Sequence, residues 1–234
     1  MERVGIEKLK FDYDLKEVSE RYEKIYVGAV YDALENLGYP NNALCRKINP
    51  LVPDMQVAGP AFTIKEHRNP TRDLKDLDRQ FQLLKFIYPG CVQIRDTGND
   101  ENAAHFGLMS SIAAMSRGCV GAVIDGCVRD AKYLIDKGFP TFVKYTIPVE
   151  AFHRITIDEV QVPIYINGAL GPVIVNPGDY IFGDIDGVVI IPKELTLKVL
   201  EEAEKIAENE KHIREDLSKK GSDPFEVYKK YGRY

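Results

Sequence analysis

The residues in this chain with the clearest chemical potential are the adjacent pair Arg129 and Asp130, which follow the apolar run 122–124 and the pair Asp125-Gly126. An arginine can hold a planar carboxylate through two parallel hydrogen bonds, and an aspartate can bind a hard divalent cation. Ligands collect at the carboxyl ends of strands in α/β sheets, so we predict that this pair clamps a 2-oxo acid onto a metal. The alternative is a surface ion pair in which Asp130 caps a short helix.

A second candidate is the turn 96–99, which precedes an expected helix at 102–117. Such a turn offers backbone N–H groups to a carboxylate or a phosphate, although the absence of a fuller glycine pattern favours an ordinary connection. His105 on that helix could act as an acid, a base or a metal ligand. A lone histidine is more often none of these.

Two acidic segments are less specific. Asp184 and Asp186 alternate in the segment 183–187 and resemble a metal or acid–base pair, but the flanking glycines favour a turn between two strands. The segment 201–215 is rich in glutamate and reads mainly as a solvated helix face with lysine pairs four residues away.

These residues need a scaffold, and the hydrophobic pattern predicts one. A strand, a loop, a helix and a second strand in succession indicate a βαβ unit with parallel, buried strands. We therefore expect one compact α/β domain with a mixed central sheet and helical ends. The expected helices are 14–38 in two segments, 73–88, 102–117 and 193–220, and the expected strands are 56–65 interrupted at Gly59-Pro60, 91–95, 122–124 and several within 140–192.

Composition narrows the class of protein. The chain has 234 residues, of which 44% are hydrophobic and 29% charged, which is ordinary for a soluble globular protein with a sizeable core. Its net charge of -5 gives no reason to expect a nucleic-acid partner. Neither a signal peptide nor an apolar run of about 20 residues is present, so we expect a cytoplasmic protein without a membrane partner. The four cysteines lack C-x-x-C spacing, which argues against structural zinc.

Six motifs together resemble the RraA-like family, which includes 4-hydroxy-4-methyl-2-oxoglutarate aldolases and RraA, a regulator of ribonuclease E. They run from the first helices to the last strand, so the resemblance covers nearly the whole chain. It implies a single RraA-like domain over 1–234 of the compact β/β/α swivelling type, with a helical N-terminal part (1–50) and a helical C-terminal extension (193–234). The motifs are VYDAL (30–34), VAGPAFTI (57–64), PGCVQIRDTG (89–98), AAHFG (103–107), GAVIDGCVRD (121–130) and VNPGDYIFGDIDGVVIIP (175–192).

The resemblance also implies roles. In the family's aldolases, Mg²⁺ or Mn²⁺ holds pyruvate as its enolate after carbon–carbon cleavage, with oxaloacetate decarboxylation as a side activity. By motif, Asp130 would bind the metal and Arg129 would hold the pyruvate carboxylate and oxo oxygen. Homotrimers or hexamers place the site between subunits, and Glu210 of a neighbour is the expected acidic contribution. Backbone amides would complete the substrate cradle at Phe106, Gly107, Leu108 and Met109.

One position departs from the family. The aldolases carry an acidic residue just after the glycine of the A-x-x-G segment, where this chain has Leu108. Leucine cannot relay a proton, so either His105, Asp96 or Asp100 substitutes, or the reaction differs. Three hypotheses therefore compete: a metal-dependent lyase acting on a 2-oxo acid, a non-catalytic binding protein of the RraA kind, and a metal-dependent enzyme acting on another hydroxy or sugar acid. The intact Arg129-Asp130 pair favours the first.

Overall fold

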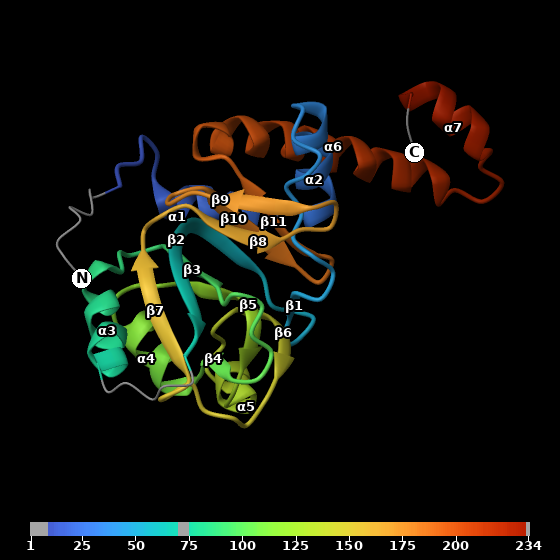
Figure 1. Ribbon diagram of the computed structural model, residues 1–234. Coiled ribbons are helices and arrows are strands. Elements are labelled where there is room, and N and C mark those ends of the chain that lie inside the picture. The colour runs from blue at the N-terminus through green and yellow to red at the C-terminus, as the bar shows by residue number, and fades with distance from the viewer. Residues whose placement is uncertain (1–8, 70–74, 233–234) are drawn as a thin grey trace.

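The computed structural model describes residues 9–69 and 75–232, and a curved mixed sheet forms the centre of this part of the protein (Figure 1). The strand order in the sheet is β1-β6-β5-β3-β2-β10-β11, with β4 paired to β5 and β7 paired to β2. The hairpin β8–β9 forms a separate two-stranded sheet. The strands are β1 (Asn49–Pro50), β2 (Val57–Arg68), β3 (Val92–Asp96), β4 (Ala104–Phe106), β5 (Gly121–Val128), β6 (Thr141–Thr146), β7 (Ile155–Val160), β8 (Ile164–Asn167), β9 (Pro172–Val175), β10 (Tyr180–Asp184) and β11 (Gly187–Ile191).

Parallel pairing brings several strand ends together at one edge. β5 lies between β3 and β6 and is parallel to both, and β4 also pairs with β5 in parallel. All eight residues of β5 are buried, as expected for a parallel strand covered on both faces. The carboxyl ends of these strands therefore open on the same side of the sheet, where Arg129 follows β5.

The helices form two groups on either side of the sheet. α1 (Leu15–Tyr22), α2 (Val27–Asn36) and α6 (Thr196–Leu217) cover one face through a core that includes Tyr22, Leu34 and Leu200. α3 (Lys75–Leu83), η1 (Leu84–Phe86), α4 (Leu108–Met115) and α5 (Ala131–Asp136) lie on the other side, around a second core that includes Phe62, Phe106 and Leu134. Figure 1 shows this division, with α3, α4 and α5 below the sheet and α2 and α6 above it.

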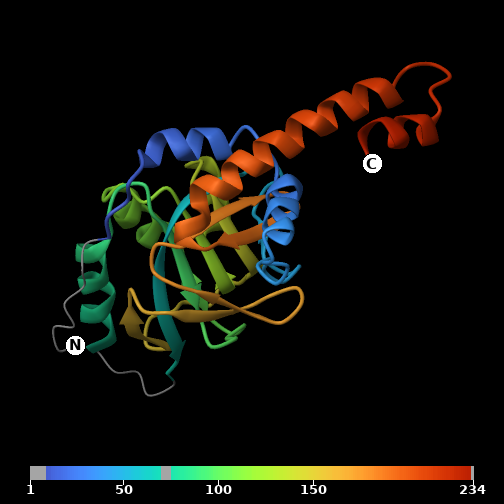
Figure 2. The ribbon, with the colours of Figure 1, turned by 90° about the horizontal axis from the view of Figure 1, so that it is seen from above.

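The C-terminal segment extends beyond the body of the domain. After η2 (Lys193–Leu195), α6 projects outward and carries α7 (Pro224–Tyr231) at its far end (Figure 2). α7 packs back on α6, where Val227 and Ile213 are buried. Within the described residues, no helix is both long and apolar enough to cross a membrane.

The predicted mixed α/β domain with helical ends is confirmed, but three local predictions were wrong. The helix expected at 102–117 is instead the strand β4 followed by the shorter helix α4, because Ala104 and Phe106 pair with the edge of β5. β2 runs unbroken through Gly59 and Pro60, and its irregularity lies between Lys65 and Glu66. At Gly59 a Cβ atom would lie 2.4 Å from the Gly90 carbonyl oxygen, so close packing explains this glycine.

The third correction concerns Asp125, which was expected to end its strand. β5 continues through Asp125 to Val128, and the buried Asp125 carboxylate lies 2.5 Å from the buried Lys144 ammonium group. This pair fixes β5 against β6 inside the fold. The helical N-terminal part consists of α1 and α2, after which 37–50 forms loops and β1. Residues 1–8, the first two of the helix expected at 73–88, and the last two of the chain lie outside the described residues.

Candidate active site at the carboxyl end of β5

A cavity of about 270 Å³ lies where β4 and β5 end and α3 and α4 approach them. Its polar side is formed by Arg129, Asp130 and Glu150, and its other side is largely apolar. All four expected substrate-cradle positions, 106–109, line it together with the Arg129-Asp130 pair. The structure thus brings together the residues that the motifs singled out.

The Arg129-Asp130 pair is half-buried at the cavity surface, with 36% and 35% of the two side chains exposed. The Nε atom of Arg129 lies 3.5 Å from Oδ2 of Asp130. Asp130 has a φ of 60°, a left-handed conformation that is uncommon for residues other than glycine and is enriched at functional sites. Asp130 precedes α5 but makes no side-chain capping hydrogen bond to it, which argues against the simple capping interpretation.

The start of α4 is held against this pair. The Leu108 backbone N–H donates to Oδ2 of Asp130 at 3.3 Å, and the Arg129 N–H donates to the Phe106 carbonyl at 3.0 Å. At Gly107, a Cβ atom would lie 3.1 Å from both Oδ2 of Asp130 and Cγ of Arg129, so a larger residue would displace the pair. The first-turn N–H groups of α4 are therefore fixed beside Arg129 and Asp130.

Sequence reasoning missed Glu150, which lies on the polar side of the cavity. Its carboxylate is 3.3 Å from Nη2 of Arg129, and 49% of its side chain is exposed. Glu150 follows β6 by a few residues and belongs to no recognisable motif. Pairing of its segment with Ala104 of β4 brings it to the site, so no local signal in the sequence could have found it.

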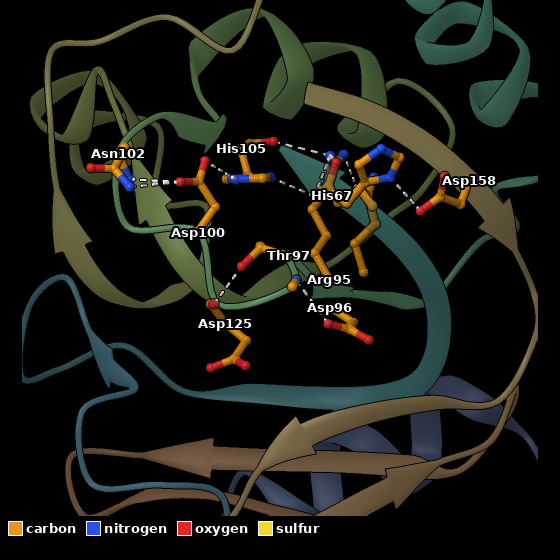
Figure 3. Close-up of polar contacts among 12 residues, drawn as sticks. His67, Arg95, Asp96, Thr97, Asp100, Asn102, His105, Asp125 and Asp158 are labelled. Carbon is orange, nitrogen blue, oxygen red and sulfur yellow. Dashed lines mark hydrogen bonds and ion pairs between the residues drawn. The ribbon is translucent and has the colours of Figure 1, made fainter. Parts of the chain in front are cut away.

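A second charged group is buried, and two of its members, Arg95 and His105, also line the cavity (Figure 3). The Arg95 guanidinium lies 3.4 Å from the Glu66 carboxylate and donates to the His105 carbonyl at 3.0 Å and to the Gln93 side chain at 2.9 Å. His105 lies between Glu66 and Asp100, with ring nitrogens 3.3 and 3.2 Å from their oxygens. We call Glu66, Arg95, Asp100 and His105 the buried charge cluster.

The members of the buried charge cluster shift one another's pKa values. Burial alone would raise the pKa of Glu66, but Arg95 and His105 outweigh it and lower that pKa. Burial likewise works against the charged form of His105, but Glu66 and Asp100 raise its pKa above the ordinary value. The pKa of Asp100 is lowered because hydrogen bonds from Asn102 and the contact with His105 exceed the effect of burial. The cluster therefore favours charged members inside the protein.

The residues proposed to replace the family's acid do not supply one to the cavity. The His105 side chain is fully buried within the cluster, and the Asp100 side chain is only 3% exposed. Asp96 accepts a hydrogen bond from the Gly98 N–H in its own turn and does not line the cavity. That turn leads into β4 rather than a helix, so it is an ordinary connection, as favoured, but one between two strands. Glu150 is the acidic residue that the structure adds to the cavity.

Two other acidic candidates lie elsewhere. Asp184 accepts hydrogen bonds from the N–H groups of Val27 and Asp186, which confirms a turn between β10 and β11 rather than a catalytic pair. Glu210 lies on α6, where it accepts a hydrogen bond from the Tyr26 hydroxyl and contacts Arg214 at 3.5 Å. It does not line the cavity of its own chain, and its expected role in a neighbouring subunit remains a prediction.

The donor set at the cavity suits one kind of metal. Within the described residues, no three His, Cys, Asp or Glu side chains lie close enough together to hold an ion. This excludes a zinc-type site with three or four protein ligands from that part of the chain. Mg²⁺ keeps several water ligands and binds through one or two carboxylates plus substrate oxygens. The half-buried Asp130 carboxylate fits that pattern, with Glu150 as a second carboxylate on the same side.

Comparison with known proteins finds one matching family and several relatives. A family model described as RraA-like, Aldolase/RraA, matches residues 27–190. An uncharacterized protein of Methanocaldococcus jannaschii is 36% identical over 83% of this chain and 91% of its own length. A protein of Halalkalibacterium halodurans, provisionally named a 4-hydroxy-4-methyl-2-oxoglutarate aldolase, is 32% identical over 79% of this chain and 81% of its own length.

Solved structures share the fold. One, described as among novel cellulases from microbes associated with the gut ecosystem, superimposes with a TM-score of 0.81 at 35% identity, covering 89% of this chain and 91% of that one. RraAS2 of Streptomyces coelicolor, described as an unusual member of the RNase ES inhibitor RraA family, superimposes with a TM-score of 0.74 at 23% identity. That match covers 85% of this chain and 96% of RraAS2, and it supports the fold.

Proposed function

Because the chain belongs to the RraA-like family, we propose that it is a divalent-metal-dependent lyase that cleaves a carbon–carbon bond of a 2-oxo acid and releases pyruvate. Aldolase names among its relatives support a lyase, and the Arg129-Asp130 pair supports the 2-oxo acid. We propose Mg²⁺ or Mn²⁺ as the cofactor and decarboxylation of oxaloacetate as a side activity.

One observation carries this proposal. Arg129 and Asp130 lie together at the carboxyl end of β5, in a cavity, with Asp130 in an unusual backbone conformation that Gly107 and the start of α4 accommodate. A surface ion pair needs none of these features. Strained backbone conformations cluster at functional sites, and a cavity gives a ligand access to the two charges.

Arg129 and Asp130 have separate proposed roles. The Arg129 guanidinium donates charge-assisted hydrogen bonds to the carboxylate of the 2-oxo acid, and the first-turn N–H groups of α4 point to the same region. The contacts described for Asp130 all involve Oδ2, which leaves Oδ1 to hold the cation. A bound Mg²⁺ or Mn²⁺ supplies Lewis-acid stabilisation of the negative charge that develops on the 2-oxo oxygen.

We propose that Glu150 takes the role of the acid that Leu108 cannot supply. In aldol cleavage the C4 hydroxyl loses its proton, the C3–C4 bond breaks, and C3 takes up a proton to give pyruvate. An exposed carboxylate beside Arg129 is within the region where that proton must move. The contact with Arg129 orients Glu150 toward the bound substrate.

We also propose that the active form is a homotrimer or hexamer. The projection of α6 and α7 away from the body leaves this segment able to reach a neighbouring subunit (Figure 2). In such an assembly Glu210 of the neighbour would approach the cavity. Sedimentation equilibrium measures the assembly, and a monomer that retains full activity would overturn this part of the proposal.

Leu108 favours one other function, a non-catalytic binding protein like the RraA proteins. Pyruvate release from 4-hydroxy-4-methyl-2-oxoglutarate and from oxaloacetate distinguishes the two. We expect release with Mg²⁺ or Mn²⁺, none with EDTA, and a large loss in Asp130→Asn. Folded protein that neither binds Mn²⁺ nor releases pyruvate from either compound would overturn the lyase and leave the binding protein.

A further inference from the structure

The cavity has two chemically different sides. Arg129, Asp130 and Glu150 form the polar side, where the proposed function places the pyruvoyl group. Much of the remaining lining is apolar, and this apolar part, which we call the apolar wall, comes from α3, η1, α4 and the loop after Glu150. The apolar wall consists of Phe81, Leu84, Leu108, Met109, Ala113 and Phe152.

The apolar wall is open to a ligand. Phe81 is 61% exposed and Met109 is 70% exposed, although both side chains line the cavity. Large apolar side chains at such exposure beside a polar site are typical of ligand pockets, in which a few polar groups orient a mostly apolar ligand surface. A three-carbon pyruvoyl group fills only part of a cavity of about 270 Å³.

The charges of the cavity leave no partner for a second carboxylate. The basic side chains among the described residues that line it are Arg129, Arg95 and His105. The His105 side chain is fully buried and already lies between Glu66 and Asp100. Arg95 is buried and already contacts Glu66, while Arg129 already faces Asp130 and Glu150. A carboxylate placed against the apolar wall would lose its hydration without gaining a cation from the same chain, and Glu150 would repel it.

We infer that the substrate carries an apolar group, rather than a second carboxylate, on the carbon beyond the bond that is cleaved. This inference rests on the proposed lyase function and names the substrate class of that same site. Leu108 then has a positive role, because an acidic residue there would place a charge in the apolar wall. The leaving product is a small apolar aldehyde or ketone.

The test compares two substrates of similar shape. In 4-hydroxy-5-methyl-2-oxohexanoate an isopropyl group takes the place of the distal carboxylate of 4-hydroxy-2-oxoglutarate. Cleavage breaks the C3–C4 bond, moves the hydroxyl proton off C4, protonates C3, and gives pyruvate with isobutyraldehyde or glyoxylate. We expect kcat/KM to be at least about 10-fold higher for the isopropyl compound, the scale that hydrophobic pockets achieve.

Substitution of the apolar wall provides a second readout. Phe81→Arg supplies the missing cation and should lower the preference for the isopropyl compound by about 10-fold. Tyr165→Arg is the matched control, because Tyr165 is an aromatic residue that is 61% exposed on β8 and does not line the cavity. It should leave the preference unchanged.

Deuterium exchange into the methyl group of pyruvate separates the possible failures, because pyruvate has no distal group. Metal-dependent exchange with equal or greater kcat/KM for the carboxylate compound would overturn this inference and leave the lyase intact. Exchange without cleavage of either compound would also overturn it. A third result is also possible, in which exchange occurs, Phe81→Arg sediments differently from the wild type and the substrate preference does not change. That result would assign the apolar wall to a subunit contact instead of a substrate site. Absence of both exchange and cleavage would overturn the lyase and this inference together.

Discussion

The Arg129-Asp130 pair and the buried charge cluster are built from the same residue types but differ in what surrounds them. Both place an arginine within 3.5 Å of a carboxylate. In the cluster, Arg95 and Glu66 are almost fully buried and their partners are other protein groups. In the pair, more than a third of each side chain is exposed to a cavity. Catalysis needs charged groups that a ligand can contact, whereas the charged groups of the cluster are paired with other groups of the protein.

The cluster and the pair are also connected. His105 belongs to β4, and the Arg95 guanidinium holds the His105 carbonyl. β4 leads directly to Gly107 and the start of α4, which contact Asp130. The cluster therefore fixes the strand on which the cavity depends, and the two regions should respond to mutation in opposite ways.

The largest expected effect is the loss of stability in Glu66→Gln. It leaves the buried Arg95 and His105 without their shared carboxylate, and breaking a buried ion pair costs about 3–5 kcal/mol of the free energy of unfolding. Urea unfolding measures this loss of stability. The control is Asp158→Asn, which removes the partially exposed partner of His67 and should cost about 0–1 kcal/mol. Equal costs for the two variants would contradict the structural role of the cluster.

For Asp130→Asn we expect a small loss of stability and a large loss of activity. Asparagine tolerates the left-handed backbone conformation, so the fold should be retained, with a change in the free energy of unfolding below about 1 kcal/mol. Pyruvate release should fall about 10²–10³-fold, the scale of losing one charge-stabilising group. Paired unfolding and kinetic measurements check this, and retained activity in a destabilised variant would reverse the assignment.

Glu150→Gln tests whether this exposed carboxylate moves a proton. We expect kcat to fall about 10²-fold with a smaller change in KM, because general acid–base groups act mainly on the chemical step. Steady-state kinetics measure both constants. The matched control is Glu101→Gln, an exposed glutamate that contacts Lys47 and lies outside the cavity. Equal kinetics for the two variants would remove Glu150 from the mechanism.

The smallest expected effect is on the pH dependence of stability. The pKa of His105 is raised in the folded protein, so its contribution is fully present below the unfolded value of about 6.5 and is lost as the pH rises through the folded value. The pKa values of Glu66 and Asp100 are lowered, so their contributions are lost as the pH falls through their folded values.

His105→Gln should therefore flatten the decline of Tm on the alkaline side. The lowered pKa values of Glu66 and Asp100 keep these two carboxylates charged throughout this range. Thermal unfolding between pH 6 and pH 9 measures the slope. An unchanged alkaline slope in the variant would show that His105 is not charged in the folded protein.

The difference between the two regions also explains what the sequence could predict. Arg129 and Asp130 are adjacent in the chain and follow an apolar run, so local pattern placed them at a strand end. Glu150 and Glu66 come from segments distant in the sequence from their partners, and β-sheet pairing brings Glu150 to β4 and Glu66 to Arg95. The small residues around Ala104 satisfied a helical pattern, but strand pairing with β5 decided the outcome.

We propose that the exposed Arg129-Asp130 pair performs metal-dependent chemistry on a 2-oxo acid. The most direct measurement is oxaloacetate decarboxylation with Mn²⁺, compared with EDTA, for the wild type, Arg129→Ala and the control Arg117→Ala. Arg117 is exposed and lies outside the cavity. We expect turnover above the metal-only rate in the wild type and in Arg117→Ala, and its loss in Arg129→Ala. Equal turnover in all three proteins, or none above the metal-only rate, would contradict the claim.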